Sequence, residues 1–302
     1  MNRSTVILAL VLLGLVACRK QAPKEMTMTS GHSVILVTES HEWLLKQESD
    51  EFTRQYPEAT LNVLAASTRE AIVQLLNDSV RTICVDRRFN EEEQAVIRKA
   101  ELKIIENKIA EDALAVIVNQ ANPQKDISRD LAKRILNGSV TRWDQSGGSK
   151  WSKPVTLVLT GKNSGAYELL QKKFFELKNP IEPGLVVTTQ RDAVEAVSKT
   201  PGAVSFVSLA ALTPTLSGVR VLGVEAKNPD GSSEAVKPSQ VDIYNKLYPF
   251  HYSLYLYNNE PKAGVGAGFS TYAMTVAGQK IIQNSGLVPA VIPTRTIQLN
   301  SE

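Results

Sequence analysis

Short hydrophobic runs and amphipathic runs alternate along the chain from Ser33 onward. The runs "SVILV", "TLNVLAA" and "TICVD" have the length and apolar character of buried β-strands. Between them, "SHEWLLKQESDEFTRQYP" and "STREAIVQLLND" place apolar residues at helical spacing. This alternation of strand and helix predicts an α/β fold whose strands are mostly parallel.

The predicted helices begin with residues that can cap them. Ser67 precedes one helix and Asn90 another, and each is followed three residues later by a glutamate, which is the capping-box pattern. Ser164 holds the same place ahead of "GAYELLQKKFF". These caps predict where the strand-to-helix loops end.

Polar strand-to-helix junctions fall near Ser40, Ser67, Asp86 and Ser164. Such junctions lie at the carboxyl ends of parallel strands, where open α/β sheets bind ligands. A helix N-terminus offers unpaired N–H groups and partial positive charge, and Gly165 lets an oxyanion approach the backbone closely. The pattern predicts an anion site, with ordinary helices that are capped but bind nothing as the alternative.

A second series of strands and helices follows Asn122-Pro123 and predicts a second α/β lobe. The segment "VRVLGVEAKNPDGSSEAVKP" is interpreted as a polar excursion. "YPFHYSLYLYNN" predicts a strand, and "GFSTYAMTVAGQKIIQNSG" predicts one last helix.

Residues 1–18 are predicted to be a signal peptide, because the apolar run "VILALVLLGLVA" follows a positive start and is too short to span a bilayer. "LVAC" resembles a bacterial lipobox, which makes Cys18 the predicted lipidation site and residues 19–32 a tether. The alternative is an ordinary signal peptide with a chance cysteine.

Composition excludes several functions. The chain of 302 residues has a formal net charge of +3, which offers no footprint for nucleic acid. The three histidines lack ligand spacing, so neither a metal nor another cofactor is expected. Cys84 is predicted to be a buried small hydrophobic residue. Ser164 has no GxSxG motif around it, so we predict that the protein is not an enzyme.

Several longer segments resemble the PstS-like phosphate-binding proteins of phosphate ABC transporters, over about Ser33 to Pro293. They are "YPEATLNVLAASTREAIVQLLND", "EDALAVIVNQANP", "DISRDLAKRILNGSVTRWDQSGG", "PVTLVLTGKNSGAYELLQKKFF" and "TVAGQKIIQNSGLVPAVIP". The resemblance implies a type II periplasmic-binding-protein fold, in which two α/β lobes are joined by two crossing strands. The crossings fall near "DALAVIVN" and "YPFHYSLYLY", with residues 33–118 and 245–302 in lobe 1 and 119–244 in lobe 2.

The resemblance also implies a ligand set drawn from four loops. In the first loop Glu39 stands where a small donor is usual, and a carboxylate beside an anion is unfavourable unless one of the two carries a proton. The implied ligand-binding residues are Glu39, Ser40, Ser67, Asp86, Arg87, Lys162, Asn163, Ser164 and Gly165.

Asp86 is the most informative of these residues. As an acceptor-only carboxylate it pairs with the P–OH of hydrogen phosphate and repels sulfate, which has no proton to give. The alternative is a surface ion pair of Asp86 with Arg87 or Arg88. Ser67 likewise has an alternative role as a purely structural cap.

The fourth loop departs from the family pattern Arg-x-x-Gly-Ser-Gly-Thr. Ser164 and Gly165 are kept, whereas the arginine is Thr160 and the final threonine is Ala166. One cation and one hydroxyl donor are therefore missing. We hypothesise that Lys162 or Arg87 compensates for the lost charge.

The implied function is capture of phosphate by a monomeric, lipid-anchored protein in the periplasm or at the cell surface, for delivery to an ABC permease. One alternative is a binder of another oxyanion or of a small carboxylate. Another is a lipid-anchored sensor or assembly lipoprotein with the same fold and no transport role.

Overall fold

The computed structural model describes residues 26–146, 150–212, 217–227, 231–260 and 263–291. The predicted signal peptide, Cys18 and the first part of the tether lie outside the described residues. Cys84 is fully buried, as predicted. None of the helices described has the length and hydrophobicity that crossing a bilayer requires.

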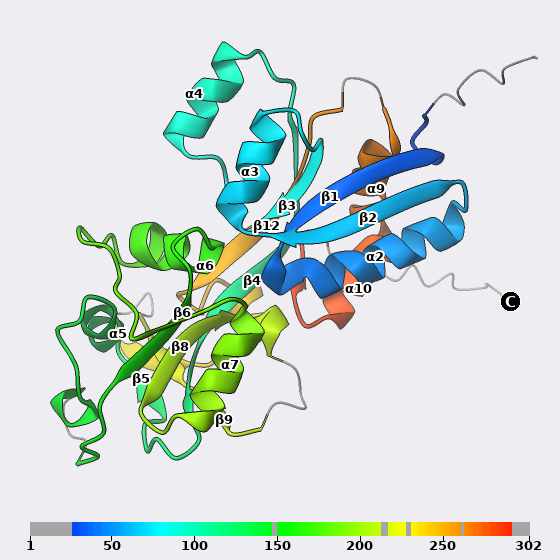
Figure 1. Ribbon diagram of the computed structural model, residues 1–302. Helices are drawn as coiled ribbons and strands as arrows, with labels where there is room; N and C mark the ends of the chain where they lie inside the picture. Colours follow the sequence, from blue (N-terminus) through cyan, green and yellow to red (C-terminus); the bar gives the residue numbers. More distant parts are fainter. Residues whose placement is uncertain (1–25, 147–149, 213–216, 228–230, 261–262, 292–302) are drawn as a thin grey trace, which may run out of the picture.

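The strands and helices follow one another as the alternating pattern predicts, and Figure 1 shows their arrangement. The strands are β1 Gly31–Thr38, β2 Ala59–Ala66, β3 Thr82–Val85, β4 Ile105–Asn119, β5 Asp126–Ile127, β6 Thr156–Thr160, β7 Leu185–Val187, β8 Ala203–Ser208, β9 Val219–Val221, β10 Gly223–Lys227, β11 Ser233–Val236, β12 His251–Asn258 and β13 Val288–Pro289. The helices are α2 Glu42–Gln55, α3 Thr68–Leu76, α4 Glu91–Lys99, α5 Arg129–Leu136, α6 Gly165–Glu168, α7 Gln190–Lys199, α8 Gln240–Tyr244, α9 Val265–Ala273 and α10 Val276–Asn284. Shorter turns of 3-10 helix are η1 Glu39–His41, η2 Trp143–Ser146 and η4 Leu209–Ala211, and η3 Leu169–Phe174 is a π-helical turn.

One long sheet runs through the molecule in the order β2-β1-β3-β12-β4-β8-β6-β7. β1 is parallel to β2 and β3, and β6 is parallel to β7 and β8, so each end of the sheet is a parallel α/β unit. We refer to the end with β1, β2 and β3 as the first lobe and the end with β6, β7 and β8 as the second lobe (Figure 1). The predicted two-lobe α/β architecture is confirmed.

The two predicted crossing strands are β4 and β12. The first part of β4, up to Ala113, pairs with β12, and Leu114 to Val118 pair with β8 in the second lobe. The chain leading into β12 places Tyr248 and Phe250 in the core of the second lobe before it enters the first. The exact boundaries, 33–118 with 245–302 and 119–244, stay a prediction.

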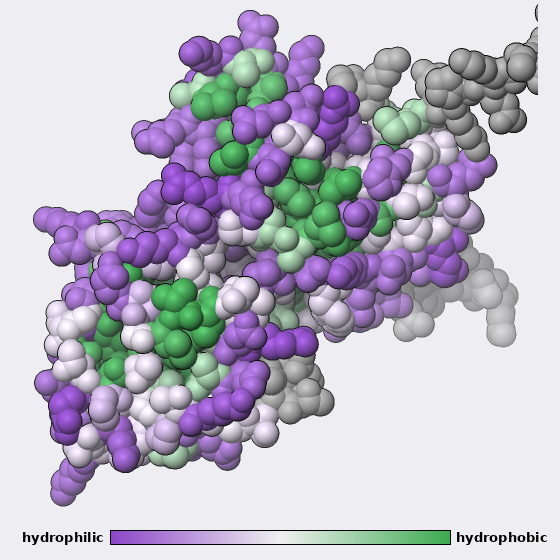
Figure 2. Space-filling view, in the orientation of Figure 1, coloured by the Kyte–Doolittle hydropathy of each residue, from purple (hydrophilic) through white to green (hydrophobic). Residues whose placement is uncertain are grey.

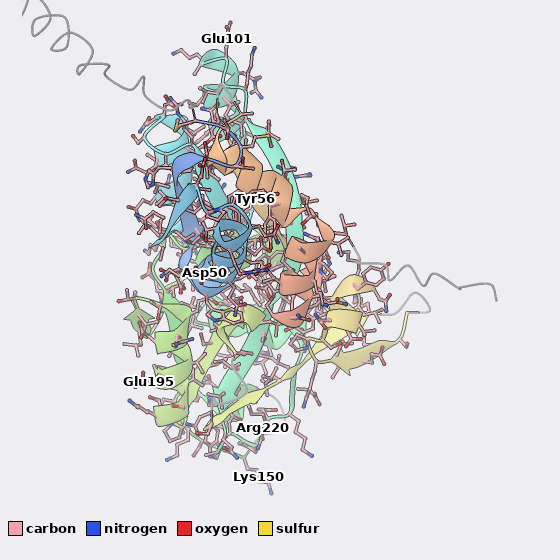
Figure 3. All side chains as sticks on the ribbon, turned by 90° about the vertical axis from the view of Figure 1, so that its right-hand side faces the viewer. Asp50, Tyr56, Glu101, Lys150, Glu195 and Arg220 are labelled. Carbon is pink, nitrogen blue, oxygen red and sulfur yellow. The ribbon has the colours of Figure 1, made fainter. Side chains whose placement is uncertain are left out.

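Each lobe buries its own hydrophobic core. Phe52, Phe269 and Leu254 pack together in the first lobe, while Trp143 and Phe206 pack in the second. In the side view of Figure 3, Asp50 on α2 and Tyr56, which follows the helix, lie over the first lobe, and Glu195 and Arg220 lie over the second. On the face drawn in Figure 2, hydrophobic residues gather in separate patches over the two lobes, with hydrophilic residues around them.

Two predictions about elements are wrong. The supposed polar excursion forms β9, β10 and β11, because Leu222, Val224 and Ala226 pack into the hydrophobic core of the second lobe. The single last helix is two helices, α9 and α10. Thr275 starts the second, since its hydroxyl accepts a hydrogen bond from the N–H of Gly278 at 3.4 Å.

Glu48 is an acidic residue on the buried face of α2. It is fully buried, and no described residue forms a hydrogen bond with either carboxylate oxygen. Burial raises the pKa of Glu48 well above its ordinary value. The folded protein therefore keeps this carboxyl protonated at pH values where the unfolded chain ionises it.

We expect Glu48→Gln to stabilise the protein increasingly as pH rises. Below pH 4.5, the ordinary pKa of Glu48, the carboxyl is neutral in both states and the substitution has little effect. Above it, the wild type loses about 1.4 kcal/mol of stability for each pH unit until Glu48 ionises in the folded state, and the glutamine variant avoids this loss. Thermal denaturation from pH 4.5 to 8 measures the difference. Asp50→Asn, on the exposed face of α2, is the control; parallel curves for Glu48→Gln and wild type would contradict the prediction.

Candidate functional site

The carboxyl ends of β1 and β3 in the first lobe face those of β6 and β7 in the second. β1 and β3 pair in register with Val37 opposite Cys84. Continuing that register by two residues places Glu39 level with Asp86. The two acidic residues of the predicted ligand set therefore leave neighbouring strands side by side and point toward the second lobe.

Asp86 is buried against the start of α6. Its Oδ1 accepts a hydrogen bond from the hydroxyl of Thr68 at 2.8 Å. A Cβ added to Gly165 would lie 1.9 Å from both carboxylate oxygens, so only glycine allows this approach. Burial is the main cause that raises the pKa of Asp86, and the Thr68 hydrogen bond opposes it.

Ser164 is the N-cap of α6, as predicted. Its Oγ accepts hydrogen bonds from the N–H of Tyr167 at 3.3 Å and from the hydroxyl of Thr160 at 2.7 Å. A serine hydroxyl has two acceptor lone pairs and one hydrogen. Both lone pairs are occupied, so what Ser164 can still offer a ligand is its hydrogen. Thr160, which replaces the family arginine, is buried beside it and orients this donor.

Glu39, like Asp86, reaches from the first lobe to the start of a helix in the second lobe. Its Oε1 accepts a hydrogen bond from the backbone N–H of Gln190, the first residue of α7, at 2.9 Å. Burial is the main cause that raises the pKa of Glu39, and this hydrogen bond opposes it. The neighbouring Ser40 hydroxyl lies 3.0 Å from Nδ1 of His41.

A buried polar network behind Ser40 was not predicted. Nε2 of His41 lies 2.9 Å from Oδ2 of Asp112, a residue of β4. The same carboxylate accepts hydrogen bonds from the hydroxyls of Ser208 and Tyr252. The histidines lack metal-ligand spacing, and that test says nothing of this network. Thr38, three residues before His41, also lies within hydrogen-bond distance of Nδ1, but Asp112 is 71 residues further on, and Ser208 and Tyr252, which bind Asp112, are more distant still, so no local pattern signals the network.

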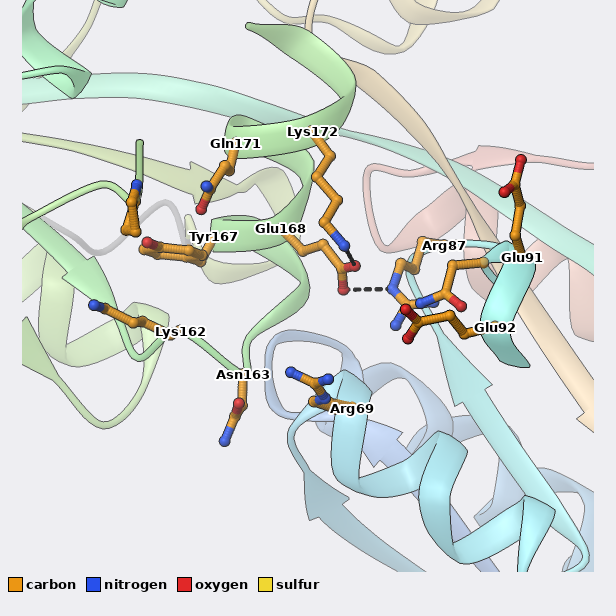
Figure 4. Close-up of a pocket in the computed structure, with 12 residues that line it drawn as sticks. Arg69, Arg87, Glu91, Glu92, Lys162, Asn163, Tyr167, Glu168, Gln171 and Lys172 are labelled. Carbon is orange, nitrogen blue, oxygen red and sulfur yellow. Dashed lines mark hydrogen bonds and ion pairs between the residues drawn. The ribbon is translucent and has the colours of Figure 1, made fainter. Parts of the chain in front are cut away.

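The two cations proposed to compensate for the missing arginine lie nearer the rim and are engaged (Figure 4). Arg87 donates from Nε to Glu168 of the second lobe at 2.6 Å and from Nη1 and Nη2 to Glu93 at 2.8 and 2.9 Å. Lys162 donates to Glu182 at 3.1 Å and is exposed. Compensation by either residue stays a prediction, and these contacts do not support it.

The remaining predicted residues have structural roles in this arrangement. The hydroxyl of Ser67 accepts a hydrogen bond from the N–H of Glu70 at 3.3 Å, which is the cap described as its alternative role. The carbonyl of Asn163 lies 3.5 Å from the N–H of Arg69, a contact between the lobes. Of the predicted set, the structure thus brings Asp86, Ser164 and Gly165 together directly. Thr68 joins them, because its hydroxyl donates to Asp86. Sequence reasoning missed Thr68, although it directly follows the predicted cap residue Ser67.

Fold and site together define a two-lobed α/β protein whose lobes meet across polar strand ends and helix starts. The model of the PBP superfamily domain matches residues 23–276. Because this match covers most of the chain, the protein belongs to the PBP superfamily.

Relatives by sequence confirm the predicted resemblance. The chain is 25% identical over 261 residues to a phosphate-binding protein PstS of Bacillus subtilis, a match that covers 86% of this chain and 81% of the relative. It is 26% identical over 251 residues to the protein SphX of Synechococcus elongatus, covering 80% and 72%.

Solved structures share the fold. A putative phosphate ABC transporter substrate-binding protein with bound phosphate from Clostridium perfringens superposes with a TM-score of 0.74 at 19% identity, covering 86% of this chain and 100% of that one. An ABC-type phosphate transport receptor from Vibrio cholerae superposes with a TM-score of 0.68 at 19% identity and the same coverage. At these identities the similarity shows the fold.

We expect Gly165→Ala to disrupt the contact between the lobes. The new methyl group meets both oxygens of Asp86, so the carboxylate or the whole loop must move, at a cost of about 1–3 kcal/mol. Gly161→Ala is the matched control, because a Cβ at Gly161 meets nothing within 4 Å. Urea denaturation of both variants measures the difference. In a protein that already carries Asp86→Ala, the loss of stability caused by Gly165→Ala should vanish. An equal loss of stability in the wild-type and Asp86→Ala proteins would refute the contact.

Proposed function

We propose that the protein captures inorganic phosphate between its lobes and delivers it to an ABC permease. The observation that carries the proposal is the group at the start of α6. A buried carboxylate, Asp86, lies against Gly165 and accepts from the hydroxyl of Thr68, and the hydroxyl of Ser164 caps the same helix. Hydrogen phosphate needs both donors for its oxygens and one acceptor for its proton. The names of the curated and structural relatives point to the same ligand.

Binding requires the lobes to separate first. In the described arrangement the Asp86 carboxylate itself fills the space against Gly165. When the lobes open, the N-terminus of α6 becomes accessible to an oxyanion, and Asp86 turns to accept the P–OH hydrogen. Closure then buries the anion among fixed donors in place of water.

The proposal also includes the oligomeric state, the lobe boundaries, the lipid anchor and the location of the protein. We infer a monomer, made of a first lobe of residues 33–118 and 245–302 and a second of 119–244, and held at a bacterial membrane by lipid on Cys18. Its place is the periplasm or the cell surface. Capture leaves the ligand chemically unchanged, since transport proteins of this class bind and release their solute.

A second candidate is a sensor or assembly lipoprotein that closes without tight ligand binding. The contact of Asp86 with Gly165 favours it, because this closed interface forms from the protein's own groups. A related candidate is a binder of another oxyanion or a small carboxylate. The replacement of the family arginine by Thr160 favours that ligand change.

We expect phosphate to raise the unfolding free energy of the protein by about 2.7 kcal/mol at a concentration 100 times its Kd. Ser164→Ala should weaken phosphate binding about 10- to 100-fold, since a hydrogen bond to a charged group is lost. Ser128→Ala is the matched control: Ser128 caps α5 through the N–H of Leu131 at 3.0 Å but is not part of the predicted ligand set.

Thermal shift and calorimetric titration with phosphate, sulfate and citrate measure these effects. Sulfate should bind far more weakly than phosphate because it cannot donate a proton to Asp86. No response to millimolar phosphate, or equal losses in Ser164→Ala and Ser128→Ala, would count against the proposal. A response to citrate alone would favour the carboxylate alternative.

A further inference from the structure

Glu39 brings a second carboxylate to the region that receives the anion. It leaves β1 level with Asp86, which leaves β3, and both side chains reach the first residue of a helix in the other lobe. Asp86 meets Gly165 of α6, and Glu39 accepts from Gln190 of α7. Two acidic groups of the first lobe thus occupy two neighbouring helix starts of the second.

The charges around Glu39 act in opposite directions. After burial, which raises the pKa of Glu39, and the Gln190 hydrogen bond, which lowers it, His41 lowers it further while Asp86 and Asp192 raise it. On its own turn, His41 pairs with Asp112. From β3 comes Asp86, and from α7 come Asp192, which raises the pKa of Glu39, and Arg191, which lines the same pocket. From α2 come Glu42 and Lys46, which pair with each other. η4 contributes only Leu209, Ala210 and Ala211.

The nearby cations Arg87 and Lys162 are paired with other carboxylates. Arg87 is held by Glu93 and Glu168, and Lys162 is held by Glu182. An anion that enters between Glu39 and Asp86 therefore meets two acidic groups. Like charges brought close together are tolerated only when protons are shared between them.

Glu39 remains reachable by protons from solvent. It lines a surface pocket together with Ser40, Thr189 and Arg191, whereas Asp86 is enclosed. A proton can therefore reach Glu39 without opening the enclosed contact between Asp86 and Gly165.

Resting on the proposed function, we propose that Glu39 makes oxyanion capture depend on an additional proton. Hydrogen phosphate carries one P–OH, which Asp86 accepts. A second carboxylate requires a second proton, carried either by dihydrogen phosphate or by Glu39 itself, and that proton lies between Glu39 and an oxyanion oxygen in the bound state. Glu39 is in this way a residue that selects the protonated form of the ligand.

A purely structural role for Glu39, as a neutral or charged cap of α7, predicts different behaviour. A glutamine at this position keeps an oxygen that can accept from the N–H of Gln190, so the contact between the lobes is preserved. Only the charge and its proton are removed. Glu39→Gln therefore separates the two roles.

The experiment is calorimetric titration of the full chain with inorganic phosphate from pH 5.5 to 8.5. We expect wild-type affinity to fall by about tenfold per pH unit toward the alkaline end, the slope for one linked proton. Glu39→Gln should lack this additional slope and bind phosphate at least about tenfold tighter than wild type at pH 8.5. Glu42→Gln, whose carboxylate pairs with Lys46 in solvent, should follow the wild type.

Calorimetric titrations in buffers of different ionisation enthalpy measure how many protons the protein takes up when phosphate binds. Wild type should take up about one more proton per phosphate than Glu39→Gln at pH 8, following the same linkage. Equal pH profiles and equal proton counts in the two proteins would overturn the role of Glu39 while leaving phosphate capture standing. Absence of phosphate binding in both proteins at every pH would overturn the proposed function, and this inference with it.

Discussion

The structure depends on β4, the strand that belongs to both lobes. Its side chains are buried from Ile109 to Asn119, and it pairs with β12 in the first lobe and with β8 in the second. Asp112 lies at the change from one partner to the other. Its carboxylate ties His41 of the first lobe and Ser208 of the second to the same strand, so the junction is specified by hydrogen bonds as well as by packing.

The molecule repeatedly uses its own carboxylates at helix starts. Glu260 accepts hydrogen bonds from the N–H groups of Gly264, Gly266 and Ala267 at the start of α9. Glu39 does the same for α7, and Asp86 lies against α6. The first of these contacts is within one lobe and stabilises a helix. The other two cross between the lobes, where an internal carboxylate and an incoming anion require the same donors.

The position of the family arginine is filled by Thr160. With Thr160 in its place, the second lobe offers a hydroxyl relay through Ser164 instead of a fixed cation. The proposed site, with neutral donors and two carboxylates, favours ligands that bring protons. Arg87, fully engaged by Glu93 and Glu168, holds the lobes together at the rim.

The sequence by itself determined the order of strands and helices, the helix caps and the family, because periodicity, caps and motif phrases are local. Asn90 and Ser164 cap the helices expected of them. Local patterns missed β9–β11 and the break at Thr275, since each depends on what the segment packs against. Only the tertiary structure decided which charged groups meet between the lobes. Arg87 and Lys162 find acidic partners distant in sequence, and Glu39, Asp86 and Gly165 meet only when two lobes close on one another.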